Sequence, residues 1–405
     1  MIIRSRTVVP MEDEPIENGA VAVEGNRIVS VGRFDEVKAE HGAEILDLGE
    51  QILLPGLING HCHLDYTMLR GKIPRQQSFS DWIWAINAHK AALQEEDYLT
   101  AIADGLAEAQ NFGTTTLVNL EAFPELLARL QRPSLRAWWC VEMIDVRWPA
   151  WVHEVAEHLF DWFQSHPKCL GGIGLAPHAP YTASAQLYSD SSAISRKQLL
   201  LTTHLAESHE EMQMFRDGRG PLFEFMKSIG RPMDDCGKET PLSFLLRRQE
   251  IGKRWIIAHL NELTEDDFGL LAHTQRFHIA HCPRSHTFLG HAPFAIQKLR
   301  TLGFNICLGT DSLASNSSLS LFSEMRELLR KEPWISPREV LEMVTVNAAR
   351  SIDRADSLGR IRPGFSADLI AIPAVPSGTE VFDAIVAFEG TVPWIMVNGE
   401  TLSPG

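Results

Sequence analysis

Residues 53–63 read LLPGLINGHCH, an apolar run of strand length that ends in two histidines separated by one residue. Seven further apolar runs follow, and helix-like segments separate them. The seven runs are 114–121 (TTTLVNLE), 135–143 (LRAWWCVEM), 171–179 (GGIGLAPHA), 199–208 (LLLTTHLAES), 254–262 (RWIIAHLNE), 277–285 (FHIAHCPRS) and 304–312 (FNICLGTDS). Alternating strands and helices indicate an α/β protein with a parallel sheet, and eight such units predict a closed (β/α)8 barrel of the TIM type.

The two ends of the chain carry short β-rich segments separated by turn residues. MIIRSRTVV (1–9) and AVAVEGNRIVSVG (20–32) open the sequence, and ADLIAIPA (367–374) and PWIMVNGETL (393–402) close it. We therefore expect residues 1–56 and 357–405 to build one small β-sandwich together, beside a barrel that spans residues 57–356.

The charge balance favours a soluble protein that handles a small molecule. The chain has 37 Lys and Arg against 52 Asp and Glu, and this net charge of −15 repels phosphate backbones and anionic lipids. We expect neither a nucleic-acid partner nor a membrane partner. The six cysteines are scattered without a CxxC pair, and no apolar run is long enough to span a bilayer. We therefore expect reduced thiols and a cytoplasmic protein.

The predicted strands end in residue types that bind metals. In a (β/α)8 barrel the reactive side chains come from the carboxyl ends of the strands. His61 and His63 lie two residues apart at the first strand end, so both point to the same side of that strand. The later strand ends carry His178, His204 with Glu207 three residues on, His259, His281 and Asp311. Imidazoles with one carboxylate suit Zn²⁺, or alternatively iron, and leave a position open for water.

We predict one divalent ion in this layer, because independent structural histidines have no reason to gather at the ends of strands one and five beside Asp311. Two other histidine motifs are not expected to bind it. His281, in HCPRSH, is expected to be structural. His153 and His158 of HEVAEH are five residues apart rather than four, which is typical of an outer helix face and not of a zincin helix.

These motifs resemble those of the amidohydrolase superfamily. The resemblance runs through PGLINGHCHLDYTMLRG (55–71), PHAPYT (177–182), HLAES (204–208), IAH (257–259), LGTDSLASN (308–316) and IRPGFSADLI (361–370). It implies a distorted (β/α)8 barrel, a β-sandwich from both termini, and a metal held by His61, His63, His204 and Asp311. Binuclear members carry a carboxylated lysine where this chain has His178, so the resemblance implies a single ion. A Glu three residues after the strand-five histidine, here Glu207, is typical of the aminohydrolase and chlorohydrolase group.

The same residues suit the steps of a hydrolytic deamination. A divalent ion lowers the pKa of bound water toward neutrality. Asp311 can take a proton from the water, and Glu207 can carry a proton first to the ring nitrogen and then to the departing amine. His259 would orient the water. The alternative for Glu207 is a structural role beside a ligand histidine.

The substrate side is predicted from a resemblance to the deaminases of S-adenosylhomocysteine and methylthioadenosine. These enzymes share LRG, the Trp of SFSDW (here Trp82), His178 and TDxxASNxSL. Shortly after that Trp, these enzymes carry a carboxylate that binds the ribose hydroxyls, whereas this chain reads IWAINAHKAA (83–92), without an acid. The run from Trp82 to Lys90 resembles aminodeoxyfutalosine deaminases instead, whose substrate carries an aryl carboxylate. We expect substrate contacts from His178, Trp82 and Arg70, and a lid at residues 70–82. Lys90 and Arg284 are further candidates for binding an anionic substrate group.

The sequence therefore predicts a homo-oligomeric, dimeric enzyme that deaminates an aminated nitrogen heterocycle, foremost a 6-aminopurine nucleoside analogue. Two alternatives stay open. Dechlorination of a triazine, or deamination of guanine or cytosine, needs the same ligands and the same Glu207. A binding protein that has lost catalysis is the alternative of another class, against which the complete set of ligands, Glu207 and His259 argues.

Overall fold

A parallel β-sheet closes on itself in the larger part of the molecule. The computed structural model describes residues 1–130, 133–146, 149–194, 199–374 and 380–403. Within these residues the sheet has the strand order β13-β12-β11-β10-β9-β8-β7-β6-β14. The strands are β6 (Leu57–His63), β7 (Thr114–Glu121), β8 (Arg136–Met143), β9 (Gly171–Pro177), β10 (Leu199–Leu205), β11 (Trp255–His259), β12 (His278–His281), β13 (Asn305–Leu308) and β14 (Asp311–Ser312). Seven of the predicted strand regions and the parallel pairing are confirmed. The first predicted strand, residues 53–63, is divided: its first three residues belong to β5 of the terminal sheet, and only β6 belongs to the barrel.

The eighth predicted strand, residues 304–312, closes the barrel in two pieces. β13 pairs with β12, and after a break at residues 309–310 β14 pairs with β6. Gly309 stands at this break, where a Cβ atom would lie 2.6 Å from the backbone oxygen of His61. Only glycine lets strands one and eight approach so closely.

Alternation along each strand separates the barrel interior from the outer layer. In β8, Trp138 and Cys140 belong to the interior hydrophobic cluster, whereas Trp139 and Val141 pack into the larger cluster that includes helix side chains. This follows from the period of two in a β-strand. Both faces of β8 are buried, which explains why parallel strands of this kind read as nearly continuous apolar runs.

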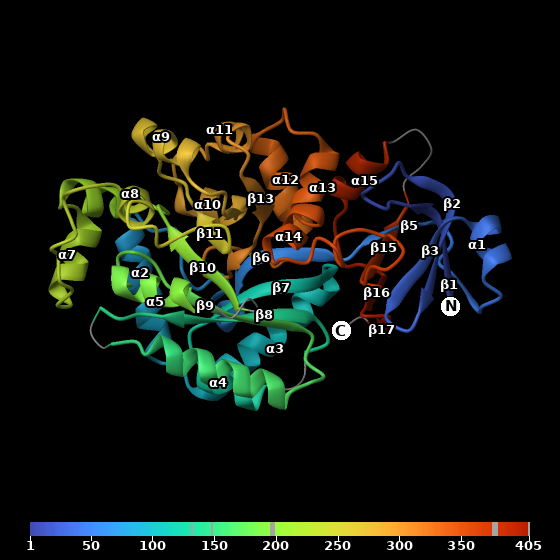
Figure 1. Cartoon of the computed structure of the whole chain (residues 1–405), viewed down its shortest axis with the longest axis horizontal. Coiled ribbons are helices and arrows are strands. Elements are labelled where there is room, and N and C mark those ends of the chain that lie inside the picture. The colour runs from blue at the N-terminus through green and yellow to red at the C-terminus, as the bar shows by residue number, and fades with distance from the viewer. Residues whose placement is uncertain (131–132, 147–148, 195–198, 375–379, 404–405) are drawn as a thin grey trace.

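Helices connect successive strands and cover the outside of the barrel (Figure 1). They are α2 (Phe79–Lys90), α3 (Glu95–Asn111), α4 (Val152–Ser165), α5 (Ala185–Ala193), α6 (His209–Met212), α7 (Pro221–Ser228), α8 (Pro241–Leu246), α9 (Glu265–His273), α10 (Pro283–Leu289), α11 (Ile296–Thr301), α12 (Leu321–Lys331), α13 (Pro337–Met343) and α14 (Val346–Ser351), with 3-10 turns η1 (Leu64–Leu69) and η2 (Pro124–Arg129) and a π-helical turn η3 (Gln213–Asp217). Thr264 and Asp267 form a reciprocal cap at the start of α9. The helical run 337–352 is divided into α13 and α14, because Val344 and Thr345 leave helical backbone geometry.

Both ends of the chain join a second sheet, near the N and C labels of Figure 1. In the described residues its order is β17-β16-β15-β5-β1-β2-β3, with β4 paired to β1. Its elements are β1 (Ile2–Val8), β2 (Ile16–Glu24), β3 (Arg27–Arg33), β4 (Ile45–Asp47), β5 (Gln51–Pro55), β15 (Leu369–Pro373), β16 (Trp394–Val397) and β17 (Glu400–Leu402), with helices α1 (Phe34–Glu40) and α15 (Val381–Ala387). Both termini contribute as predicted, although the strands pair into one continuous sheet with its own small hydrophobic cluster.

A buried ion pair fastens the terminal sheet to the barrel. Arg136, at the start of β8, donates from Nε to Asp368 Oδ2 (2.9 Å) and from Nη2 to Asp368 Oδ1 (3.2 Å). The large hydrophobic cluster also continues from the barrel into Ile385 of α15 and Ile395 of β16. Apolar packing therefore crosses the boundary between the barrel and the terminal sheet. The division of the chain into a barrel at residues 57–356 and an appendage from the two terminal segments stays a prediction.

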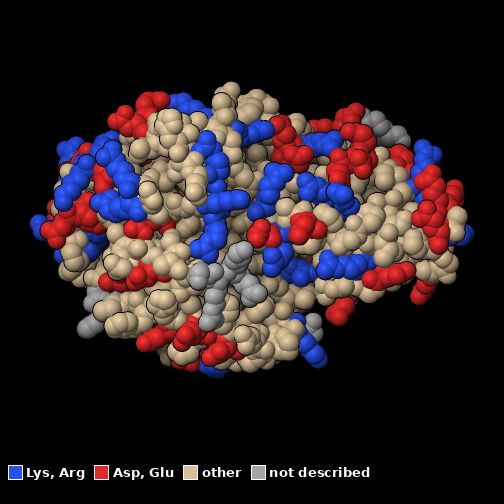
Figure 2. Space-filling model, in the orientation of Figure 1, with Lys and Arg blue, Asp and Glu red and all other residues tan. Residues whose placement is uncertain are grey.

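The surface carries charges of both signs. Figure 2 shows Lys and Arg side chains interspersed with Asp and Glu over one face of the molecule. Among the described residues, no helix is both long and apolar enough to cross a membrane.

Candidate active site

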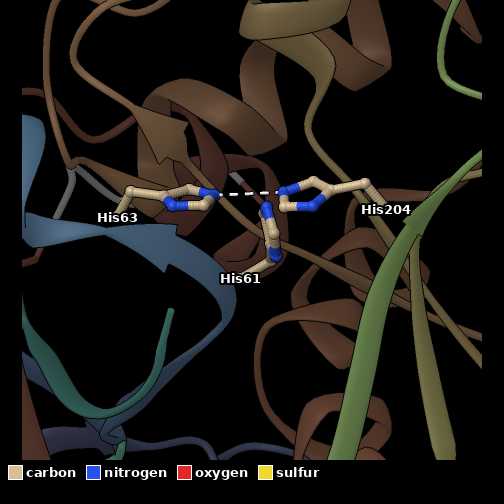
Figure 3. A group of neighbouring side chains, drawn as sticks. All are labelled: His61, His63 and His204. Carbon is tan, nitrogen blue, oxygen red and sulfur yellow. Dashed lines mark hydrogen bonds between the residues drawn. The ribbon is translucent and has the colours of Figure 1, made fainter. Parts of the chain in front are cut away.

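Three histidine side chains converge where the first and fifth strands end (Figure 3). His61 and His63 come from β6, and His204 comes from β10. The Nε2 atoms of His63 and His204 lie 3.1 Å apart, and the ring centre of His61 lies 5.0 Å from each of theirs. The register of β6 against β7 shifts between Asn59 and Cys62, which resets the alternation so that both histidines face the interior.

Asp311 joins this group from the eighth strand. Its φ of +56° lies in the left-handed region that few residues other than glycine adopt. Its Oδ1 lies 3.7 Å from His61 Nε2 and 3.8 Å from His63 Nε2. Its Oδ2 accepts hydrogen bonds from the hydroxyls of Ser285 (2.5 Å) and Ser315 (3.1 Å). The two serines thus hold the carboxylate with its other oxygen toward the histidines.

The donor set fits one divalent cation. His204 donates from Nδ1 to the backbone oxygen of His178 (2.8 Å), so its Nε2 presents a lone pair to the group. Burial, together with the imidazoles of His178 and His61, lowers the pKa of His204 to about 3, which keeps this ring neutral at pH 7. Both ring nitrogens of His61 are buried without a hydrogen-bond partner in the described chain. A cation among His61, His63, His204 and Asp311 would occupy the lone pair of His61 that faces Asp311.

The loop after β10 is held rigidly around Glu207. The backbone N–H groups of Ala206 and Glu207 donate to the two carboxylate oxygens of Glu211 (3.1 and 2.8 Å). The side-chain amide of Asn261 donates to the backbone oxygen of Glu207 (3.0 Å). These bonds hold the backbone of Glu207 in place and do not involve its carboxyl group.

The carboxyl group of Glu207 faces two imidazoles. Its Oε1 lies 3.7 Å from Nε2 of His259 and 4.0 Å from Nε2 of His291. Burial, with the nearby carboxylates of Asp311 and Glu211, raises the pKa of Glu207 well above its usual range. This group therefore favours its protonated form and can donate a proton to a molecule beside it.

One cavity of about 380 Å³ joins these groups. Its lining includes His63, His204, Glu207, His259 and Asp311. The predicted substrate residues His178 and Trp82 also line it, as does Lys90, and the remaining wall is largely apolar. A small-molecule site usually combines a mostly apolar wall with a few convergent polar groups.

Residues 52–402 match the amidohydrolase family. The chain belongs to this family. A shorter match, to an imidazolonepropionase-like composite domain of bacteria, covers residues 19–43 in the terminal sheet of this amidohydrolase.

Similar proteins include deaminases of adenosine-like compounds. The chain is 29% identical over 388 residues to a 5-methylthioadenosine/S-adenosylhomocysteine deaminase of Pyrococcus furiosus, covering 92% of this chain and 86% of the relative. An aminofutalosine deaminase of Helicobacter pylori, solved with methylthio-coformycin, has a TM-score of 0.82 at 20% identity, over 99% of this chain and 100% of that one. An adenosine deaminase of Xanthomonas campestris, solved with bound zinc, has a TM-score of 0.80 at 24% identity, over 99% and 92%. The two structures share the fold of this amidohydrolase.

Two predicted substrate cations lie outside the cavity lining of this amidohydrolase. Arg70 forms an ion pair with Glu108 and donates to the backbone oxygen of Ser317 (3.1 Å). Arg284 donates from Nη1 to the hydroxyl of Ser318 (3.1 Å). Both guanidinium groups bind the segment that follows Asp311, so the geometry gives no support to a substrate contact by either.

The segment predicted as a lid, residues 70–82, is anchored at its end. The carboxylate of Glu210 accepts hydrogen bonds from the backbone N–H groups of Phe79 (2.8 Å) and Ser80 (3.1 Å) at the start of α2. Glu210 stands three residues beyond Glu207, so α2, which carries Trp82 over the cavity, is tied to the loop of Glu207. Closure of this segment stays a prediction.

The three histidines that were not expected to bind the metal, His281, His153 and His158, occupy places that agree with structural roles. His281 stacks on Phe294 with ring centres 4.0 Å apart and is absent from the cavity lining. His153 and His158 lie exposed on α4.

One cavity residue, Glu142, and one neighbour of Glu207, His291, escaped the sequence analysis. Glu142 ends the third predicted strand two residues after the interior Cys140, so strand alternation could have identified it. His291 lies in the loop between α10 and α11, where no periodic pattern marks its direction.

Proposed function

We propose that this amidohydrolase removes the amino group of a 6-aminopurine nucleoside by metal-dependent hydrolysis and releases ammonia. The observation that carries the proposal is the position of Glu207 and His259 beside the group of His61, His63, His204 and Asp311. All of these residues except the fully buried His61 line the same cavity. The names of its relatives, deaminases of methylthioadenosine, S-adenosylhomocysteine and aminofutalosine, support the choice of substrate class.

The metal would be a single divalent ion, foremost Zn²⁺, held by His61, His63, His204 and Asp311. Neutral imidazoles with one carboxylate are typical zinc ligands, and an adenosine deaminase of the same fold was solved with zinc. When bound, such an ion lowers the pKa of water toward neutrality and so supplies hydroxide at pH 7.

The side chains of the chain itself account for the proton transfers. Water adds to the ring carbon that bears the amino group, and the bond from that carbon to the amino nitrogen breaks. One proton of the water goes to the ring nitrogen and the other to the departing amine, which leaves as ammonia. Asp311 can accept one proton from the water, and Glu207, whose carboxyl favours protonation, can give its own proton to the ring nitrogen. Glu207 can then take the proton of the added hydroxyl group and pass it to the amine, and Asp311 can return its proton to Glu207. His259, 3.7 Å from Glu207, can orient the water.

The rest of the substrate would occupy the remaining cavity. Trp82 of α2 and Phe225 of α7 supply flat apolar surface for a heterocycle, and His178 supplies a polar contact. Lys90 would meet an anionic substrate group, because it lines the same cavity. Its Nζ donates to Tyr66 Oη (2.7 Å), which also lines the cavity. A dimer stays a prediction.

The test is a side-by-side measurement of ammonia release and metal content. Zinc-loaded protein should deaminate at least one of adenosine, methylthioadenosine, S-adenosylhomocysteine and aminodeoxyfutalosine, with about one ion per chain. Activity confined to aminodeoxyfutalosine would support recognition of its aryl carboxylate, for which Lys90 is the candidate that lines the cavity. Inactivity on all four, together with turnover of guanine, cytosine or a chlorotriazine, would overturn the nucleoside assignment.

A further inference from the structure

His291 is a buried imidazole that takes no part in the proposed proton transfers. It lies in the loop between α10 and α11, and only 5% of its side chain is exposed. Its Nε2 is buried and has no hydrogen-bond partner in the described chain. A buried polar atom without a hydrogen bond destabilises a fold, so this nitrogen needs a partner close by.

The carboxyl group of Glu207 is placed to be that partner. Its Oε1 lies 4.0 Å from Nε2 of His291 and 3.7 Å from Nε2 of His259. His259 stacks with His204 of the metal group, with ring centres 5.4 Å apart, whereas the ring centre of His291 lies 6.2 Å from that of Phe79 in α2. Glu207 thus lies between one imidazole on the metal side and another on the side of α2.

His291 lies outside the cavity that the substrate would occupy. It lines a second cavity of about 410 Å³ and is absent from the lining of the active-site cavity. Phe79 lines both cavities, so its ring forms part of the wall between them. An influence of His291 on the reaction therefore has to act through Glu207 and not through contact with the substrate.

The loop that carries His291 is tied to α10. The backbone N–H groups of Gly290 and His291 donate to the backbone oxygen of His286 (3.1 and 3.3 Å). The Nε2 of His286 donates to the backbone oxygen of Ala292 (2.7 Å), and its ring packs edge-on against that of His281, with ring centres 5.3 Å apart. These contacts hold the imidazole of His291 in place beside the carboxyl group.

A neutral imidazole suits a carboxyl group that gives up and regains a proton. Burial and the nearby imidazole of His286 lower the pKa of His291 to about 3, so its ring is neutral at pH 7 and carries one N–H donor. Once Glu207 has released its proton, it is a buried carboxylate, which an N–H donor stabilises. A shift of about 1 Å would bring its oxygen from 4.0 Å to hydrogen-bond distance. Hydrogen bonds in active sites are often longer before the substrate binds.

We propose that His291 is a positioning residue for the proton shuttle, its Nε2–H donating a hydrogen bond to Oε1 of Glu207. The bond strengthens when Glu207 becomes a carboxylate and leaves the other carboxyl oxygen free to exchange protons with the substrate. No proton moves to or from His291. The inference rests on the proposed function, because it takes Glu207 to carry protons.

A double-mutant cycle with Glu207 tests this role. His291→Phe keeps a ring and removes the donor, so kcat should fall by about 10- to 100-fold while KM stays within about threefold. His291→Gln retains an N–H donor and should keep kcat within about fivefold of wild type. In a Glu207→Gln background, His291→Phe should lower kcat by less than about threefold. His209→Phe is the matched control, because His209 lines the same second cavity, and it should leave kcat unchanged.

A wild-type rate in His291→Phe would overturn the role. A rate in His291→Gln as low as that of His291→Phe, or a full loss that persists in the Glu207→Gln background, would also overturn it. The zinc content of each variant should equal that of wild type.

A measurement without turnover tests the contact itself. NMR spectra of zinc-loaded protein, isotope-labelled at the histidine nitrogens, should contain an Nε2–H signal that disappears in His291→Gln. Glu207→Leu removes the acceptor and should move this signal upfield. A signal that is absent from wild type or unmoved by Glu207→Leu would overturn the inference. Failure of the wild type to release ammonia from any nucleoside would refute the proposed function, whereas this signal would still decide whether His291 donates to Glu207.

Discussion

Replacing Glu207 with Gln is the most direct test of the proton-transfer role. The substitution keeps the size of the side chain and removes the proton that the buried carboxyl group delivers. The backbone of residue 207 is fixed by Glu211 and Asn261 independently of the side chain, so the loop should keep its position. The metal group should also stay intact, because Glu207 is not among its members.

The expected effect on the rate is large. General acid catalysis by one side chain contributes about 10²–10⁴-fold, so kcat should fall by that factor, or about 3–5 kcal/mol in activation free energy. KM should change little, since the amide retains hydrogen-bonding capacity toward a bound ring. His259, 3.7 Å from Glu207 Oε1, is neutral through burial, which lowers its pKa well below the usual range, so it cannot replace the lost acid.

The assay is ammonia release at saturating nucleoside, with zinc measured on the same samples. Glu262→Gln is the matched control: it makes the same chemical change nearby, in a residue that pairs with His209 and lies outside the active-site cavity lining. The control should keep nearly full activity. A Glu207→Gln enzyme that retained more than about a tenth of the wild-type kcat would refute the acid role.

Three further predictions concern the metal and the stability of the fold. His63→Ala should lose zinc and turnover while retaining its circular dichroism spectrum; a zinc-replete, active variant would contradict the proposed ligand set. Asp368→Ala should lower the free energy of unfolding by about 3–5 kcal/mol in urea titrations, because it leaves buried Arg136 without its carboxylate; a change below about 1 kcal/mol would show that water replaces the pair. Burial raises the pKa of Glu324 in the folded chain to about 8, whereas the pKa of a glutamate in an unfolded chain is about 4.3. Between these two values the folded chain binds one more proton than the unfolded chain, so the free energy of unfolding falls as the pH rises. Glu324→Gln should therefore reduce the pH dependence of unfolding by up to about 1.4 kcal/mol per unit between those values, and an unchanged slope would contradict the buried proton.

The sequence alone determined the barrel and the gathering of the strand-end histidines with Asp311. Eight apolar runs separated by helical segments are sufficient to predict parallel strands, and parallel strands bring their carboxyl ends to one edge. His61, His63, His204 and Asp311 could therefore be placed together although 250 residues separate the first from the last. Alternation along a strand and the order of strands are local or topological rules, so they can be read without coordinates.

Only the tertiary structure decided which side chains face the cavity and which are engaged elsewhere. Arg70 looked free to meet a substrate, yet Glu108, distant in sequence, holds its guanidinium. Glu142 gave no motif, yet it lines the cavity near the end of β8. His291 reaches Glu207 from an irregular loop. A charge takes the partner that folding brings within a few ångströms, and no periodicity along the chain encodes that choice.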